Sequence, residues 1–361
     1  MKWHQLLVWL LATAWCAACA VNPVPTPSSE NSAGGRTGLS DASADGGKRA
    51  LDAAAAAEAD ATASDAAAAK DTGLDSGAGE PTVLPFDPTA TDPAIKKALQ
   101  PHRAWLTPAK AHSGKLVLFL GGTDSHPGQY DLLLAEAARL GHHVLGLHYP
   151  NEQSVAGLCG ADLNCYEHVR RELLEGVDYS PKIAIGQAES IENRLIKALL
   201  WLELHDPGRG WGQFLSANKP KWAALIAAGL SLGAGQAALI GKLHAVDRVV
   251  LLAGVVDGSE KGPAAWISNN HLTESARYFG FAHKDDPLFA RIQANWIALG
   301  MGSPGNAVDV DKAQVPYPTS QQLTTAWPTK QPHGSVGVDQ ATPMAGVVPR
   351  YRDAWRYLIG L

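Results

Sequence analysis

The spacing of apolar and polar residues predicts alternating strands and helices from residue 115 to the C-terminus. Short continuous apolar runs are typical of buried strands, whereas apolar residues repeated every three or four positions indicate helices. Strands are therefore expected at 115–120, 143–147, 223–228, 248–253, 277–282 and 323–327. Helices are expected at 130–140, 189–204, 236–244, 287–299 and 348–361. This alternation predicts an α/β fold, with a mostly parallel sheet covered by helices on both faces.

The N-terminal part of the chain lacks such a pattern. Residues 6–14 are a short apolar run that follows Lys2, which is typical of a secretory signal peptide and too short to span a bilayer comfortably. The next segment is rich in Ala, Asp, Ser, Thr and Gly and has too few bulky apolar residues to offset the entropy of ordering it. We therefore predict a signal peptide at 1–20, a disordered linker at 21–82 and one folded domain at 83–361.

Two interpretations of the N-terminal processing stay open. Cleavage after Ala20 would release a secreted protein. Alternatively, residues 17–19 (Ala-Ala-Cys) resemble the end of a bacterial lipobox, with lipidation at Cys19, although Cys16 stands where Leu or Val is usual. The polar linker would then tether the domain to a membrane. We expect an exported protein, either a cell-envelope lipoprotein or a secreted one, that meets a membrane only through this anchor.

Composition and cysteine content narrow the class of protein. The chain has 361 residues, 46% of them hydrophobic, and a net charge of −5 at pH 7, so global basicity does not favour a nucleic-acid partner. Cys159 and Cys165 are the two cysteines of the domain, and in an exported protein they are expected to form a disulfide. The histidines between residues 112 and 148 lack metal-ligand spacing, and no dinucleotide or Walker motif is present. We expect neither a metal nor a cofactor.

Residues 229–233 read Gly-Leu-Ser-Leu-Gly and carry the clearest chemical signal in the sequence. This G-x-S-x-G motif lies between an expected strand and an expected helix, which is the context of a nucleophile elbow. The elbow holds its serine in a strained turn, and glycines two residues away on either side avoid a clash. Ser231 is therefore the candidate nucleophile, at the positive end of the following helix dipole. The alternative is a plain glycine-rich turn with Ser231 as a helix cap.

With this motif in this context, the chain resembles the α/β-hydrolase superfamily over roughly residues 116–361. The resemblance implies an α/β-hydrolase catalytic domain with a serine, an acid and a histidine in that order along the chain. Residues 283–287 look like the family's G-x-x-D-P turn, with His283 in place of glycine, which makes Asp286 the expected acid. Asp285 and Asp257 stay open as alternatives. A helix cap is the other role for Asp286, and the two roles are compatible.

The resemblance also implies the base and the oxyanion hole. His333 lies in a loop before the last expected helix, where the family carries its catalytic histidine, and it is the only histidine after His283. The N–H group of Leu232, directly after the nucleophile, is one expected oxyanion donor. The second should follow the strand at 115–120, where Gly122 is the first choice and Thr123 the second.

These residues predict an exported serine hydrolase, most simply a carboxylesterase that acts on a small-molecule ester through an acyl-enzyme on Ser231. A peptidase or amidase on the same fold is the alternative among enzymes. The alternative from another class is a non-catalytic surface binding protein on a hydrolase scaffold, for which the unusual Leu120 and His283 leave room. The natural substrate and the oligomeric state are not predicted.

Overall fold

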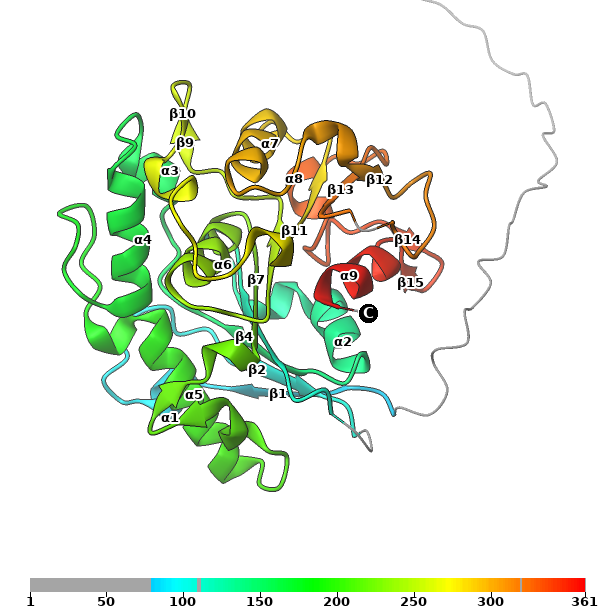
Figure 1. Ribbon diagram of the computed structural model, residues 1–361. Helices are drawn as coiled ribbons and strands as arrows, with labels where there is room; N and C mark the ends of the chain where they lie inside the picture. Colours follow the sequence, from blue (N-terminus) through cyan, green and yellow to red (C-terminus); the bar gives the residue numbers. More distant parts are fainter. Residues whose placement is uncertain (1–78, 109–111, 319, 361) are drawn as a thin grey trace, which may run out of the picture. The chain divides into compact units, whose positions relative to one another are not determined.

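The computed structural model describes residues 79–108, 112–318 and 320–360 (Figure 1). The predicted signal peptide, Cys19 and the linker up to residue 78 lie outside the described residues. In the described part, nine strands form one sheet in the order β1-β2-β4-β3-β7-β8-β11-β13-β12. Every neighbouring pair from β4 to β12 is parallel, whereas β1 and β2 are joined to the sheet by antiparallel pairing. The predicted α/β class with a mostly parallel sheet is confirmed.

All six predicted strands are present, with bounds that differ from the expected ones by a few residues. The structure adds an edge that the pattern did not predict, because β1 and β2 contain Pro85 and Arg103 and do not form continuous apolar runs. The first of these strands begins inside the predicted linker. The strands of the sheet are β1 Thr82–Phe86, β2 His102–Leu106, β3 Leu116–Leu120, β4 His143–Leu147, β7 Leu225–Leu230, β8 Arg248–Leu252, β11 Tyr278–His283, β12 Val308–Asp309 and β13 Gln322–Thr325.

Three short hairpins lie outside the large sheet. They pair β5 Leu215–Ser216 with β6 Lys219–Pro220, β9 Gly258–Ser259 with β10 Gly262–Pro263, and β14 Met344–Ala345 with β15 Val348–Pro349. The last hairpin corrects the prediction of a helix from 348 to 361. Pro349 completes the hairpin, and the terminal helix begins only at Arg352.

The helices cover both faces of the sheet (Figure 1). The segment 158–182 contains the end of α3 and all of α4. The helices are α1 Pro88–Thr91, α2 Asp131–Arg139, α3 Val155–Cys159, α4 Cys165–Glu175, α5 Ile191–His205, α6 Leu232–Leu243, α7 Phe289–Ala298, α8 Pro332–Ser335 and α9 Arg352–Ile359. Short 3₁₀ turns are η1 Pro127–Gln129, η2 Gln187–Glu189, η3 Trp211–Phe214, η4 Trp222–Ala224, η5 Ala265–Ile267, η6 Ser275–Arg277 and η7 Pro304–Asn306.

Each central strand contributes to two separate apolar cores, because successive side chains point to opposite faces of a sheet. In β3, Leu116, Leu118 and Leu120 pack on the side of α4, α5 and α6, whereas Val117 and Phe119 pack on the side of α2 and α9. All five side chains are buried. The continuous apolar runs of the sequence are thus explained by strands that are covered on both faces.

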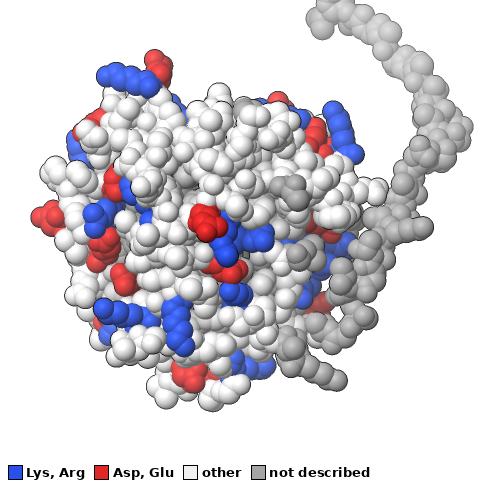
Figure 2. Space-filling view, viewed as in Figure 1, with Lys and Arg blue, Asp and Glu red and all other residues white. Residues whose placement is uncertain are grey.

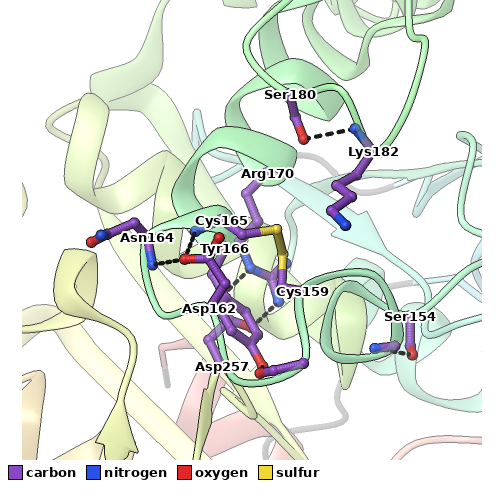
Figure 3. The surroundings of a disulfide bond; sticks show 12 residues. Ser154, Cys159, Asp162, Asn164, Cys165, Tyr166, Arg170, Ser180, Lys182 and Asp257 are labelled. Carbon is purple, nitrogen blue, oxygen red and sulfur yellow. Dashed lines mark hydrogen bonds and ion pairs between the residues drawn. A yellow bond between two sulfur atoms is a disulfide. The ribbon is translucent and has the colours of Figure 1, made fainter. Parts of the chain in front are cut away.

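The predicted disulfide between Cys159 and Cys165 is present (Figure 3). It joins the last residue of α3 to the first residue of α4, with a Cα–Cα distance of 5.4 Å. One turn further along α4, the Arg170 guanidinium forms a fully buried ion pair with Asp257, at 2.6 Å from Nε to Oδ2 and 2.5 Å from Nη2 to Oδ1. The ion pair fastens α4 to the segment that follows β8.

Charged side chains of both signs are interspersed over the face shown in Figure 2. This distribution fits the small net charge of the chain. Within the described residues, no helix combines the length and the apolar character that crossing a membrane requires.

Candidate active site

Ser231 lies at the carboxyl end of β7, the middle strand of the sheet, and directly before α6. Its φ of +57° is in a region that residues with a side chain rarely adopt, so the turn is strained. The strain is held by the surrounding backbone, since the Ser231 N–H donates to the Leu252 carbonyl at 2.8 Å. This is the geometry expected of a nucleophile elbow.

The two glycines of the motif have the steric role that the sequence predicted. A Cβ atom at Gly229 would collide with the backbone of Gly233, and a Cβ atom at Gly233 would collide with the carbonyl oxygen of Leu120. The tight turn therefore depends on glycine at both positions. Because the turn lies against the end of β3, it brings Ser231 close to the loop that follows that strand.

The structure brings Asp286 and His333 together, although 47 residues separate them. Asp286 follows β11, and His333 lies in α8, after β13. The Nδ1 atom of His333 is 2.7 Å from Oδ2 of Asp286, whose side chain is fully buried, while the histidine is 34% exposed. With Nδ1 directed at a carboxylate, the network assigns the neutral ring proton to Nδ1 and leaves the Nε2 lone pair free to accept a proton.

Asp286 also supports the turn that leads into α7, although the N-cap of this helix is Leu288 and not Asp286, as the alternative role would require. Its Oδ1 accepts from the Leu288 N–H at 2.8 Å, just before α7. The two carboxylate oxygens thus bind different partners, one in the turn and one on His333. The unusual His283 supports the same turn, because its Nδ1 accepts from the Asp285 N–H and its Nε2 lies 2.8 Å from the Trp327 carbonyl oxygen.

The two other candidate acids lie in different surroundings. Asp285 is exposed and contributes its backbone N–H to His283. Asp257 is fully buried and holds Arg170, and its Oδ2 also accepts from the Trp266 indole N–H at 2.9 Å. Neither residue contacts His333, so the imidazole has a single carboxylate partner among the three candidates.

Ser231 and His333 line the same cleft, which has a volume of about 400 Å³. The loop after β3 forms another wall of this cleft, with Gly122 and Thr123 among its residues. The other lining residues are Asp124, Ser125, Gln129, Tyr130, Leu230 and Val338. The carboxyl ends of β3, β7 and β13 therefore contribute to one site, because the carboxyl ends of parallel strands meet at one edge of a sheet.

The two expected oxyanion donors in the loop after β3 differ in whether their N–H groups already have an acceptor inside the protein. The Gly122 N–H donates to the Tyr130 hydroxyl at 3.0 Å, so it already has an acceptor inside the protein. The Thr123 N–H has no acceptor among the described residues. Of these two expected donors, Thr123, the second choice, therefore has the uncommitted N–H group in the part of the chain that the structure describes. Leu232 begins α6, so its N–H has no acceptor within the helix.

Three side chains that the sequence did not single out hold this loop in place. The Asn151 side-chain amide donates to the carbonyl oxygens of Gly122 and Ser125 at 2.7 and 2.8 Å, and the Tyr149 hydroxyl donates to that of Gly121 at 2.8 Å. The Tyr130 hydroxyl, which accepts from the Gly122 N–H, donates to the Ser125 hydroxyl at 2.8 Å. Burial raises the pKa values of Tyr130 and Tyr149, so both hydroxyls keep the protons that they donate. Both Tyr149 and Asn151 follow β4, which pairs with β3, and this adjacency is the signal that could have found them.

A further carboxylate ties the segment after His333 to the opposite wall. Asp339 accepts from the N–H groups of Asp131 and Leu132 at the start of α2, at 2.9 and 3.1 Å. Its own N–H donates to the Gln129 carbonyl. Burial raises the pKa of Asp339 to about 6. The segment that carries the imidazole is thereby linked to the residues beside the β3 loop.

Three buried tryptophans and two segments of the chain are not part of the cleft. Trp211, Trp266 and Trp296 are buried in the core and do not line it. The segments 158–182 and 257–275 contribute no residue to the cleft lining that the structure describes. No cluster of three or more potential metal-ligating side chains occurs among the described residues.

Comparisons with protein-family models and with curated proteins find no match to this chain.

Proposed function

We propose that this protein is a serine hydrolase of the α/β-hydrolase fold, most simply a carboxylesterase. The observation that carries the proposal is a strained Ser231 turn that shares a cleft with His333, whose Nδ1 binds the buried Asp286. This set follows the chain order serine, acid, histidine and uses one edge of a parallel sheet.

In the proposed reaction, the Ser231 oxygen attacks the ester carbonyl carbon while its proton passes to Nε2 of His333. The carbonyl oxygen takes up the negative charge and accepts from the N–H groups of Leu232 and Thr123. The carbon–oxygen bond to the alcohol then breaks, and His333 returns the proton to the departing alkoxide. Water repeats these steps on the acyl-enzyme and releases the carboxylic acid. Asp286 holds the imidazole in the required tautomer and stabilises its charged form.

A fluorophosphonate probe tests this assignment, because it forms a stable bond only with an activated serine. We expect stoichiometric labelling of the wild type at Ser231, located by peptide mass spectrometry, and none of Ser231→Ala. Ser303→Ala is the matched control, since this exposed serine also lies in a glycine-rich loop, at 302–305, but does not line the cleft. An unlabelled wild type, or labelling that survives Ser231→Ala, would contradict the proposal.

The bond type is tested with p-nitrophenyl esters and the corresponding p-nitroanilides. If the protein is an esterase, as proposed, the p-nitrophenyl esters should be hydrolysed and the anilides should react far more slowly. Turnover of anilides without turnover of esters would make the amidase alternative correct. Turnover of neither, with no probe labelling, would leave a non-catalytic binding protein as the better description.

A further inference from the structure

The charge of the cleft comes from one carboxylate. Asp124 is exposed and lines the cleft together with Ser231 and His333. No lysine or arginine is among the lining residues that the structure describes. The ion pairs formed within the described part of the chain involve other carboxylates. Asp124 therefore brings a negative charge to the cleft without a cation to balance it.

The place of Asp124 in the loop after β3 is set by backbone contacts. The Asp124 N–H donates to the Asn151 carbonyl oxygen at 2.9 Å, and φ at Asp124 is +54°. Asn151 is itself buried and holds both ends of the turn through Gly122 and Ser125. Asp124 directly follows Thr123, so the two Cα atoms are about 3.8 Å apart. Asp124 thus lines the cleft as the residue directly after the one whose N–H group we assign to the oxyanion.

Such a charge opposes the proposed reaction unless something neutralises it. Negative charge develops on the substrate carbonyl oxygen in the transition state, and a neighbouring carboxylate raises the energy of that state. A positive charge on the substrate would remove this penalty and would also attract the substrate to the cleft. It would at the same time disfavour anionic substrates.

Resting on the serine-hydrolase function proposed above, we propose that the substrate is a small ester that carries a cationic group, an ammonium or a guanidinium, which pairs with Asp124. Asp124 is then a specificity-determining residue. A cleft of about 400 Å³ accommodates a compact ester with such a group. The cation belongs to either the acyl or the alcohol part of the ester, and the two arms of the experiment distinguish these sources.

The experiment compares cationic esters with uncharged esters of the same shape. Acetylcholine and 3,3-dimethylbutyl acetate form the pair for the alcohol part. The p-nitrophenyl esters of 4-(trimethylammonio)butanoate and of 5,5-dimethylhexanoate form the pair for the acyl part. For the wild type we expect kcat/KM to be about tenfold higher for the cationic member of one pair, and this preference should shrink in 0.5 M NaCl.

Asp124→Asn removes the charge but keeps a residue that tolerates a positive φ. We expect the preference to fall to about one in this variant, because the cationic ester reacts more slowly while the neutral ester reacts faster as the carbonyl oxygen loses a negative neighbour. Glu260→Gln is the matched control, since it removes one exposed negative charge from the turn between β9 and β10 and should keep the preference.

The possible results separate this inference from the function on which it rests. Neutral esters hydrolysed in a Ser231-dependent manner, with no preference in either pair, would overturn the cationic substrate and leave the hydrolase intact. A preference that persists in Asp124→Asn would also overturn it. Absence of both turnover and fluorophosphonate labelling would overturn the hydrolase function, and the cationic substrate with it.

Discussion

Asp257 and Asp286 follow neighbouring strands of the sheet, β8 and β11, and both are buried, yet their partners differ. Asp257 is held by two nitrogens of Arg170 and by the indole of Trp266, all of them enclosed in the protein. Asp286 binds one backbone N–H and the imidazole of His333, which is partly exposed in the cleft. The first carboxylate is fully occupied by contacts inside the protein, whereas the second binds an imidazole that is partly exposed in the cleft and that we propose as the base.

The comparison separates two roles for a buried aspartate, one structural and one that we propose to be catalytic. Removing one member of a buried ion pair leaves the other charge without compensation, so such a residue is required for stability. A carboxylate that orients an imidazole contributes to the reaction through the tautomer and charge of that ring. The same chemical change, aspartate to asparagine, should therefore have different consequences at the two positions.

Asp286→Asn should produce the largest effect, a fall in kcat of about 10³- to 10⁴-fold for a p-nitrophenyl ester. The new amide would donate to Nδ1 of His333, so the ring proton would move to Nε2, which could then no longer accept the Ser231 proton. Steady-state kinetics with thermal unfolding of the same samples measure this. Asp285→Asn, at the exposed neighbour, should change kcat by less than about twofold. A folded Asp286→Asn protein with a tenth of the wild-type rate would refute the assignment.

Asp257→Asn should instead lower the free energy of unfolding by about 3–5 kcal/mol, because the Arg170 guanidinium would stay buried without a counter-charge. Urea denaturation measures the loss, and the exposed Glu260→Gln should stay within about 0.5 kcal/mol of the wild type. If the single variant does not fold, the double variant Arg170→Met/Asp257→Leu should recover stability, because it removes both charges. A loss below about 1 kcal/mol would mean that the ion pair is not a structural requirement.

The smallest expected effect is on the acid stability of the protein and comes from His148, a buried histidine near the positive charge of Arg194. Burial, followed by the nearby positive charge of Arg194, lowers the pKa of His148 to about 4. The folded protein thus binds fewer protons than the unfolded chain between pH 6.5 and 4, so the stability present above pH 6.5 is lost as the pH falls toward 4. We expect a loss of roughly 1–2 kcal/mol from this residue, after a reduction for solvent screening.

His148→Gln tests this, because glutamine keeps an acceptor for the Gln100 N–H that Nδ1 of His148 now accepts at 2.9 Å. Urea denaturation at several values between pH 7 and pH 4 should show a shallower decline in stability for this variant than for the wild type. His205→Gln, on the exposed side of α5, should keep the wild-type slope. Equal slopes for all three proteins would show that the charge state of His148 does not contribute to acid sensitivity.

Much of the fold could be predicted from local pattern. The six apolar runs predicted the parallel part of the sheet because a strand buried on both faces has no polar alternation to obscure it. β1 was missed because it is an edge strand interrupted by Pro85, and β2 was missed because it begins with His102 and Arg103 and so has no continuous apolar run. The last helix was predicted too long because the two-residue strand β15, Val348–Pro349, is too short to show a period in the sequence.

The sequence by itself determined the glycine-flanked turn at Ser231 and the closeness of Cys159 and Cys165, because both depend on residues within a few positions of each other. Only the tertiary structure decided which carboxylate meets the imidazole and which amide faces the cleft. Asp286 and His333 are 47 residues apart, and Arg170 and Asp257 are 87 residues apart. Such partners are chosen by the order of strands in the sheet, which brings distant loops together at one edge and which no local pattern encodes.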